Sequence, residues 1–283
     1  MNKTDSCEDH VFSLSTIIQN RLHNGKDTFV AFIDFSKAFD SVDRTLLLHK
    51  LLDYNVNGNI YMAIKRLYCN TQNCLKINNM YTRWFPSFYG VRQGDSLSPT
   101  LFSIFLNDLA NSIQTAKLGI DIGTKNIGIL MYADDVALLA EDENKLQREI
   151  NILRDWCNTW RLNVNLAKSQ IMHFRKSRKR LTKFNFMFGD KPIEMVSKYR
   201  YLGIIFDENL NFTECATTLA DSAGRALGSV ISKFSSFKNI RFSIFTKLFD
   251  STVWPILDYC SSVWSYKKHQ YASKIQNRAS RYF

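Results

Sequence analysis

Two adjacent aspartates interrupt an otherwise apolar stretch of this sequence. Residues 129–140 read I-L-M-Y-A-D-D-V-A-L-L-A, with Asp134 and Asp135 at the centre. A buried carboxylate is strongly penalised unless it is neutralised, paired or bound to a cation, so the pair requires either a solvated turn or a metal ion. Taken alone, the two residues are more typical of a solvated hairpin tip, because aspartate is a common turn residue.

A third carboxylate favours the metal ion. Residues 29–33 form an apolar run typical of a buried strand, and Asp34 follows its last residue. Hard divalent cations of the magnesium type take oxygen ligands, and two such ions about 3.5–4 Å apart can activate an attacking oxygen and stabilise a leaving one in phosphoryl transfer. Asp34, Asp134 and Asp135 together have the ligand chemistry for this. The sequence therefore predicts a metal-dependent phosphoryl-transfer site.

Five sequence blocks stand out along the chain: D-F-S-K-A-F-D from Asp34, G-V-R-Q-G-D-S-L-S-P from Gly90, Y-A-D-D from Tyr132, L-N-V-N-L-A-K-S from Leu162 and Y-L-G-I-I-F-D from Tyr201. In this order they resemble the reverse transcriptases, most closely those of non-LTR (LINE-type) retrotransposons. The first three are similar to the catalytic blocks of that family, the fourth to its lysine-bearing segment and the fifth to its primer grip. The resemblance covers most of the chain and leaves open another lineage of the same catalytic class, such as an intron-encoded maturase.

The resemblance implies two bound Mg²⁺ ions, with Mn²⁺ as an alternative. One ion is assigned to Asp34 and Asp134, and it lowers the pKa of the primer 3′-hydroxyl. The other is assigned to Asp34, Asp135 and the carbonyl of Phe35, and it carries the triphosphate. The division between the two adjacent aspartates stays open. Lys168, which judged alone is a surface lysine, is implied as the proton donor to the leaving pyrophosphate.

The same resemblance implies contacts with the nucleotide and the primer. Phe39 has the position beneath the sugar of the incoming nucleotide, where a ring excludes a ribose 2′-hydroxyl and selects deoxynucleotides by steric clash. By residue type alone it is a core aromatic. Gln93 and Gly94 are implied in nucleotide and template contact, since glycine allows close approach of the backbone. Leu202 and Gly203 look like ordinary strand residues and are implied as primer contacts.

These implied roles describe an RNA-directed DNA polymerase, which extends a primer 3′-hydroxyl with dNTPs on an RNA template. Its expected partners are an RNA template, a DNA primer or RNA–DNA hybrid, and the other domains of a longer polyprotein. The family's basic fingers segment precedes the first block by far more than the 33 residues available before Asp34. The chain is therefore expected to be amino-terminally truncated, and the alternative is a catalytically inactive nucleic-acid-binding fragment or relic.

Composition agrees with a polyanionic partner. Lys and Arg total 37 against 26 Asp and Glu, and the net charge is +11. The sequence has no apolar run of 18 residues and no signal-peptide core, so no membrane partner is expected. Its six scattered cysteines lack zinc-ligand spacing and favour free thiols in a reducing compartment. We expect an intracellular protein, in the nucleus or in a cytoplasmic ribonucleoprotein.

One basic cluster has no assigned role. It consists of Arg175, Lys176, Arg178, Lys179 and Arg180. Such a cluster is most often a solvated loop, but it is equally compatible with a phosphate-contacting patch or a nuclear-import signal. The sequence does not separate these readings.

The pattern of apolar residues predicts an α+β fold. By resemblance this is a right-hand polymerase palm with an antiparallel sheet and packed helices, partial fingers and a helical thumb-like subdomain, divided into residues 1–211 and 212–283. Asp40 and Asp43 are expected to act locally as turn, capping or surface residues, and Ser41 to cap the helix that follows it. Helices are expected at 9–23, through 46–52, at 59–68, from 98, at 143–160 and in most of the chain after 213. Strands are expected at 29–33, on both sides of Asn78-Asn79, around Asp134, and at 172–174, 184–188 and 201–206.

Overall fold

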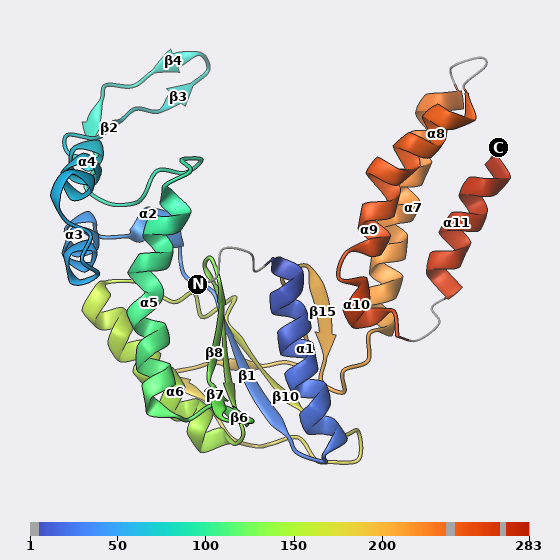
Figure 1. Ribbon diagram of the computed structural model, residues 1–283, viewed down its shortest axis with the longest axis horizontal. Coiled ribbons are helices and arrows are strands. Elements are labelled where there is room, and N and C mark those ends of the chain that lie inside the picture. Colours follow the sequence, from blue (N-terminus) through green and yellow to red (C-terminus); the bar gives the residue numbers. More distant parts are fainter. Residues whose placement is uncertain (1–5, 236–240, 267–269, 283) are drawn as a thin grey trace. The chain divides into compact units, whose positions relative to one another are not determined.

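The computed structural model describes residues 6–235, 241–266 and 270–282, which form two compact units of mixed helix and strand (Figure 1). The sheet unit contains residues 29–171 and 183–195. The helical unit contains the described parts of residues 1–28, 172–182 and 196–283. The predicted α+β class is confirmed, whereas the boundary placed at residue 211 stays a prediction.

A five-stranded sheet forms the centre of the sheet unit, in the order β13-β10-β1-β9-β8. β9 pairs antiparallel with both β1 and β8, and β10 pairs parallel with β13. All six residues of β1 are buried, as its continuous apolar sequence predicts. The strands are β1 (Thr28–Ile33), β8 (Ile129–Tyr132), β9 (Asp135–Ala140), β10 (Gln170–Phe174) and β13 (Glu194–Met195).

Helices α5 and α6 cover this sheet. Their apolar faces pack against β8 and β9, and Phe105 of α5 and Leu153 of α6 are completely buried there. α5 begins at Ser98 with Pro99 in its first turn. Backbone N–H groups in the first turn have no hydrogen-bond partner within the helix, so proline, which lacks this group, is tolerated there. The helices predicted at 59–68, from 98 and at 143–160 are confirmed. The helices of this unit are α2 (Ala38–Ser41), α3 (Arg44–Asp53), α4 (Gly58–Tyr68), α5 (Ser98–Ala116) and α6 (Glu143–Trp160).

The cap of α3 differs from the prediction. Asp43, not Ser41, precedes this helix, and its Oδ1 accepts hydrogen bonds from the N–H groups of Thr45 at 2.9 Å and Leu46 at 3.3 Å. Ser41 ends α2 instead and donates its hydroxyl to the carbonyl of Ser36 at 2.9 Å. The prediction for Ser41 is wrong because Asp43 is the residue next to the helix, where its carboxylate also interacts favourably with the helix dipole. The capping role expected of Asp43 is confirmed.

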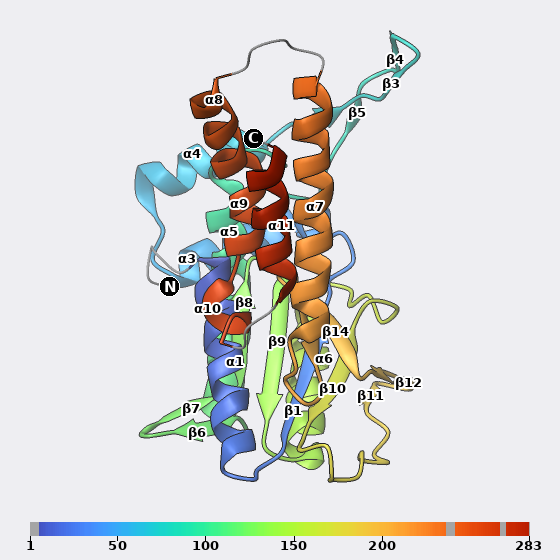
Figure 2. The same ribbon diagram turned by 90° about the vertical axis from the view of Figure 1, so that its right-hand side faces the viewer.

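Residues 71–89 form a narrow two-stranded ribbon that we call the arm. β2 (Gln72–Asn73) pairs with β5 (Phe85–Pro86), and β3 (Lys76–Ile77) pairs with β4 (Met80–Tyr81). Asn78 and Asn79 make the turn with φ of 46° and 65°, a conformation that asparagine tolerates. The strands predicted on both sides of this turn are confirmed. Both views show the arm extending away from α4, with β3 and β4 at its far end (Figures 1 and 2).

Two smaller hairpins complete the sheet unit. β6 (Ile120–Ile122) pairs with β7 (Lys125–Ile127), and β11 (Met187–Phe188) pairs with β12 (Lys191–Pro192). A turn at Gly189 and Asp190 connects the second pair. The strand expected at 184–188 is confirmed only for residues 187 and 188, because 184–186 make no ladder of their own.

In the helical unit, α1 is confirmed close to its predicted bounds, and most of the described chain after residue 213 is helical as expected. α7 packs against α9 and α11, with Leu227, Val253 and Leu257 buried among them (Figure 2). No described helix is both long enough and apolar enough to cross a membrane. The elements are α1 (Cys7–His23), β14 (Lys198–Tyr201), β15 (Ile204–Asp207), α7 (Thr213–Ser235), α8 (Phe242–Leu248), the π-helical turn Phe249–Val253, α9 (Trp254–Asp258), α10 (Ser261–Trp264) and α11 (Gln270–Tyr282).

The single strand predicted at 201–206 is instead a hairpin. β14 and β15 pair antiparallel with Tyr201 opposite Ile204, so Leu202 and Gly203 are the two turn residues. Their φ values are 45° and 84°. Apolar residues on both sides of the turn conceal it, because only the glycine signals a reversal and leucine rarely adopts a positive φ.

Candidate active site

The central sheet brings the three predicted carboxylates together. In the β1–β9 ladder Ile33 lies opposite Val136, so the next residues along the two strands are Asp34 and Asp135. β8 and β9 are joined by a two-residue turn made of Ala133 and Asp134. Three carboxylates from two separate parts of the chain therefore meet at one edge of the sheet.

The turn itself is strained. Ala133 has a φ of 52°, in the left-handed region that non-glycine residues rarely adopt. Such strain persists only where the surrounding structure holds it, and here the flanking ladder pairs Tyr132 with Asp135. The ladder thus fixes the position of the Asp134 side chain at the tip.

The environment of Asp135 opposes its ionisation. Burial raises the pKa of Asp135 above its usual range, and the negative charges of Asp134 and Asp34 raise it further. All three side chains are partly buried. A divalent cation would relieve this repulsion, and oxygen donors are the ligands that Mg²⁺ prefers.

The described residues include no group of three acidic, histidine or cysteine side chains that could hold one ion. The assignment made from the sequence gives each of the two ions only two carboxylate ligands. It therefore does not require three such side chains around one ion. The donor chemistry and the mutual repulsion fit cations at this edge of the sheet.

Backbone hydrogen bonds connect the end of β1 to the segment that contains Lys168. The Asn165 N–H donates to the Asp34 carbonyl at 2.8 Å, and Phe35 forms a β-bridge with Val164. The Asp34 N–H donates to Ser169 Oγ at 3.0 Å. These bonds hold Lys168, four residues after the bridge, beside the carboxylates.

A cavity of about 490 Å³ opens in front of the carboxylates. Six of the ten predicted site residues line it, contributed by the end of β1, α2, the loop before α5, the hairpin turn and the segment after α6. Asp135 and Gly94 do not line the cavity but are neighbours of lining residues. The six are Asp34, Phe35, Phe39, Gln93, Asp134 and Lys168.

Phe39 forms part of the cavity wall and is held in place by packing. Its ring stacks on Phe102 of α5 with 4.7 Å between centroids, and its carbonyl accepts a 2.8 Å hydrogen bond from the Val91 N–H. The backbone around Gly90 passes so close that an added Cβ would lie 3.0 Å from backbone atoms of Asp40. Glycine is therefore required at this position. The close contact fixes the sequence block that begins at Asp34 against the block that begins at Gly90.

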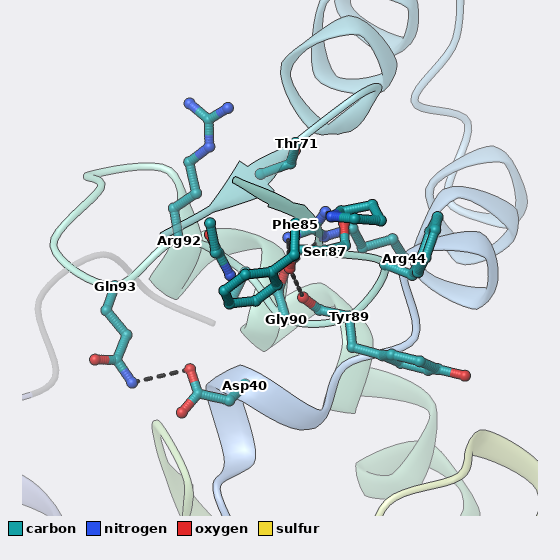
Figure 3. Close-up of a pocket in the computed structure, with 13 residues that line it drawn as sticks. Asp40, Arg44, Thr71, Phe85, Ser87, Tyr89, Gly90, Arg92 and Gln93 are labelled. Atoms are coloured by element: carbon teal, nitrogen blue, oxygen red, sulfur yellow. Dashed lines mark hydrogen bonds between the residues drawn. The ribbon is translucent and has the colours of Figure 1, made fainter. Parts of the chain in front are cut away.

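Asp40 has a contact that sequence reasoning missed. Its Oδ1 accepts a hydrogen bond from Gln93 Nε2 at 3.0 Å (Figure 3). Both residues line the cavity. Its local role was expected, but its partner lies 53 residues away. The only sign of this contact in the sequence was Asp40 itself, the second aspartate of the block D-F-S-K-A-F-D. This contact orients the Gln93 amide toward the site.

Comparison with known proteins identifies the family. A family model described as "Reverse transcriptase (RNA-dependent DNA polymerase)" matches residues 1–206. The chain belongs to the reverse transcriptase family. The resemblance to a LINE-type retrotransposon reverse transcriptase is confirmed by the curated proteins that it matches.

Two of these relatives come from insects. The chain is 27% identical over 211 residues to the "Retrovirus-related Pol polyprotein from type-1 retrotransposable element R2" of Nasonia vitripennis, covering 72% of this chain and 20% of that polyprotein. It is 25% identical over 251 residues to the "RNA-directed DNA polymerase from mobile element jockey" of Drosophila funebris, covering 87% of this chain and 27% of the relative. The chain thus spans a small part of the length of these reverse transcriptase relatives.

Two telomerase structures share the fold. One, from Candida albicans in complex with a TWJ fragment of telomeric RNA, gives a TM-score of 0.50 at 14% identity over 99% of this chain and 47% of that one. The other, apo telomerase from Candida tropicalis truncated from the C-terminal domain, gives 0.51 at 13% identity over 73% of this chain and 39% of that one. At these identities the likeness concerns the fold alone, and it confirms the predicted right-hand polymerase architecture.

The residues expected at the reverse transcriptase primer grip lie in the helical unit. Leu202 and Gly203 form the turn between β14 and β15, and the Leu202 carbonyl accepts a 2.7 Å hydrogen bond from the hydroxyl of Tyr259. A Cβ added at Gly203 would lie 3.1 Å from the same tyrosine ring. Tyr259 therefore packs directly on the turn, a role that its position in the sequence did not signal.

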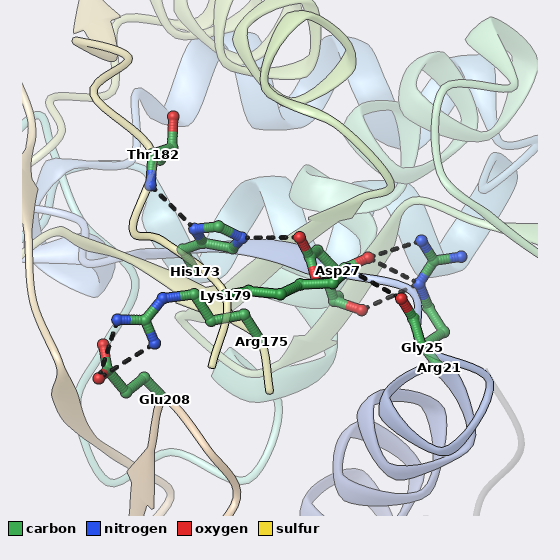
Figure 4. A network of polar contacts seen from close by, with 9 residues as sticks. Arg21, Gly25, Asp27, His173, Arg175, Lys179, Thr182 and Glu208 are labelled. Carbon is green, nitrogen blue, oxygen red and sulfur yellow. Dashed lines mark hydrogen bonds and ion pairs between the residues drawn. The ribbon is translucent and has the colours of Figure 1, made fainter. Parts of the chain in front are cut away.

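The basic cluster is divided between structural and exposed side chains. Arg175 pairs with Glu208 at 3.1 Å, and Lys179 pairs with Asp27 at 2.7 Å (Figure 4). The other three members, Lys176, Arg178 and Arg180, are exposed. The two ion pairs anchor the loop, and they leave open whether the exposed members contact phosphate, serve as an import signal or are only solvated.

Proposed function

We propose that this chain is the polymerase domain of a retrotransposon reverse transcriptase, and that it extends a primer 3′-hydroxyl with dNTPs on an RNA template. The observation that carries the proposal is the convergence of Asp34, Asp134 and Lys168 on one cavity, beside Asp135 with its raised pKa. Family membership supports the reaction class. A carboxylate with a perturbed pKa beside a cavity is typical of functional sites.

Two divalent ions, Mg²⁺ or Mn²⁺, belong to this proposal. We assign one to Asp34 and Asp134, and the other to Asp34, Asp135 and the Phe35 carbonyl. When bound, such ions lower the pKa of the 3′-hydroxyl and neutralise the charge of the triphosphate.

The side chains around the cavity position the substrates. Lys168 and Phe39 both line the cavity. In this proposal Lys168 gives a proton to the leaving pyrophosphate, and the Phe39 ring closes the space beside the nucleotide sugar. Gln93, held by Asp40, and Gly94 contact the nucleotide and template. The 3′-oxygen then attacks the α-phosphate in line and pyrophosphate leaves. Because little covalent chemistry falls to the protein, positioning and electrostatics supply most of the rate.

The proposal extends to the partners and the setting. Leu202 and Gly203 contact the primer, which is a DNA primer or the DNA strand of an RNA–DNA hybrid. The chain matches a segment that makes up 20% of one relative and 27% of the other. This supports the proposal that the chain works together with further domains of a polyprotein. We place the protein inside the cell, in the nucleus or in a cytoplasmic ribonucleoprotein.

Primer extension tests the function. The purified chain is given a primed homopolymer RNA, dNTPs and Mg²⁺ or Mn²⁺, beside an Asp134→Asn variant and an Asp190→Asn control in an exposed turn of the same unit. We expect synthesis by the parent and the control and none by Asp134→Asn, with hybrid binding nearly unchanged in all three. Equal synthesis by Asp134→Asn would refute the metal assignment.

The same assay separates a second candidate, a non-catalytic nucleic-acid-binding domain. No synthesis in the presence of tight hybrid binding would select it. Fusion to the remaining polyprotein domains would then be the next preparation to assay.

A further inference from the structure

The arm exposes eight large apolar side chains. Trp84 is 65% exposed and Phe88 is 72% exposed, and every residue of its four short strands is exposed. A two-stranded ribbon is marginally stable and gains nothing from solvated aromatic rings, so such a surface indicates a binding site. The exposed large side chains of the arm are Leu75, Ile77, Met80, Tyr81, Trp84, Phe85, Phe88 and Tyr89.

The charged residues of the arm and its flanking sequence are all basic. Between Asp53 and Asp95 the sequence contains no acidic residue. Its basic residues in that interval are all exposed, and Lys76 lies over the ring of Tyr81 with 5.5 Å between Nζ and the ring centroid. Exposed aromatic rings interleaved with cations, on a segment that has no acidic residue of its own, match single-stranded nucleic acid, whose bases stack and whose phosphates attract cations. The basic residues are Lys65, Arg66, Lys76, Arg83 and Arg92.

The base of the arm adjoins the candidate active site. A second cavity, of about 530 Å³, lies where the arm meets the loop before α5, and Phe85 and Tyr89 are among its lining residues (Figure 3). Asp40 and Gln93 line both this cavity and the catalytic one. A strand leaving the catalytic cavity past Gln93 therefore reaches the aromatic surface directly.

We propose that the arm binds the unpaired RNA template ahead of the copied base, with template bases stacked on Trp84, Phe88 and Tyr89 and phosphates near Arg83. This rests on the proposed polymerase function. During synthesis the primer is paired, and bases within a duplex are already stacked on one another, so the unpaired template is the strand whose bases are free to stack. A protein partner would need an acidic contact surface to match these basic residues, whereas every nucleotide of the template brings a phosphate.

Equilibrium binding tests the proposal. The chain is titrated, by fluorescence anisotropy, against a labelled primer–template hybrid that is blunt, has an eight-nucleotide RNA template overhang, or has the same overhang with abasic sites. The test variant is Trp84→Ala with Phe88→Ala. The control is Ile60→Ala with Met62→Ala, two exposed apolar residues of α4 in the same unit. Thermal unfolding checks that all variants keep the fold.

Each stacked base is worth about a 5- to 150-fold gain in affinity by the usual stacking energies. We expect the natural overhang to tighten binding by the parent and the control at least tenfold relative to the abasic overhang. The test variant, which keeps only Tyr89 of the three rings, should lose most of this preference. An equal preference for the natural overhang in parent and test variant would overturn the proposal. A parent that binds the natural and abasic overhangs with equal affinity would also overturn it.

Two further readouts keep this proposal separate from the polymerase proposal. Asp134→Asn should keep the full overhang preference although it makes no DNA. A parent that discriminates overhangs but makes no DNA refutes polymerase activity of this chain and leaves the arm assignment standing. If instead the test variant alters only the sedimentation of the chain, the arm is an interface between copies of the protein and the template assignment is wrong.

Discussion

Phe39 decides, in our proposal, which sugar enters the cavity. The ring is fixed by its stack on Phe102, so it cannot swing away without breaking that stack. Phe39→Val should open the space occupied by the ring and lower the preference for dNTPs over rNTPs by at least tenfold. The ratio of kcat/KM for dTTP and UTP on an RNA template measures this. Phe39→Tyr keeps the ring and should keep the preference, and an unchanged ratio in the valine variant would disprove the steric gate.

A second residue-scale prediction concerns Glu149, a completely buried acid of α6 whose carboxyl oxygens have no hydrogen-bond partner among the described residues. Burial raises the pKa of Glu149 to about 9, whereas Lys145 lowers it slightly. Between the usual carboxyl pKa and about 9, the unfolded chain releases this proton and the folded chain keeps it. The free energy of unfolding therefore falls as pH rises through that range.

Glu149→Gln removes this titration while keeping the shape of the side chain. Its Tm should match that of the parent near pH 4 and exceed it increasingly toward pH 8, which thermal unfolding followed by circular dichroism measures at each pH. A constant Tm difference across this range would show that the acid is already ionised in the fold.

The sequence predicted the types of the site residues better than their contacts. Asp34 and Asp134 were found because carboxylates in apolar runs are costly without a partner. Asp40 was assigned only a local role because its hydrogen bond to Gln93 depends on how two distant blocks pack. Long-range side-chain contacts of this kind leave no periodic signal in one sequence.

At the scale of elements, the β14–β15 turn shows the same limit. The run around Leu202 looks extended, and the reversal depends on a positive φ that Tyr259, 57 residues later, supports through its hydrogen bond. In contrast, the helices at 59–68 and 143–160 follow directly from apolar periodicity, because their own sequences determine which face is buried.

Tyr259→Phe should loosen this turn. The variant loses one hydrogen bond, worth about 1 kcal/mol, to a carbonyl in a strained turn, so we expect the KM for primed template to rise several-fold while kcat changes little. Steady-state primer extension at varied hybrid concentration gives both constants. Tyr266→Phe is the matched control, because its hydroxyl donates at 3.3 Å to the carbonyl of Leu210, another leucine with a positive φ. Equal changes in both variants would indicate a general loss of stability.

For the whole molecule, the net charge of +11 predicts salt-sensitive binding to nucleic acid. Whether a basic side chain contributes to this binding depends on its exposure. Lys179 is already paired with Asp27, and Arg175 with Glu208, so neutralising them would disturb the loop. The exposed Lys176, Arg178 and Arg180 are the members whose charge is free to meet phosphate.

Replacing Lys176, Arg178 and Arg180 with glutamine therefore tests the basic cluster without breaking its anchors. Removing one cation that neutralises a phosphate should reduce the slope of log K against log salt by about 0.9 on a duplex. A patch that contacts phosphate predicts a slope shallower by about two units or more, measured by anisotropy from low to physiological salt. Lys117→Gln with Lys125→Gln, two exposed lysines of the sheet unit, is the control and should change the slope much less. An unchanged slope in the triple variant would show that the loop is solvated, because counterion release depends only on charges that meet the backbone.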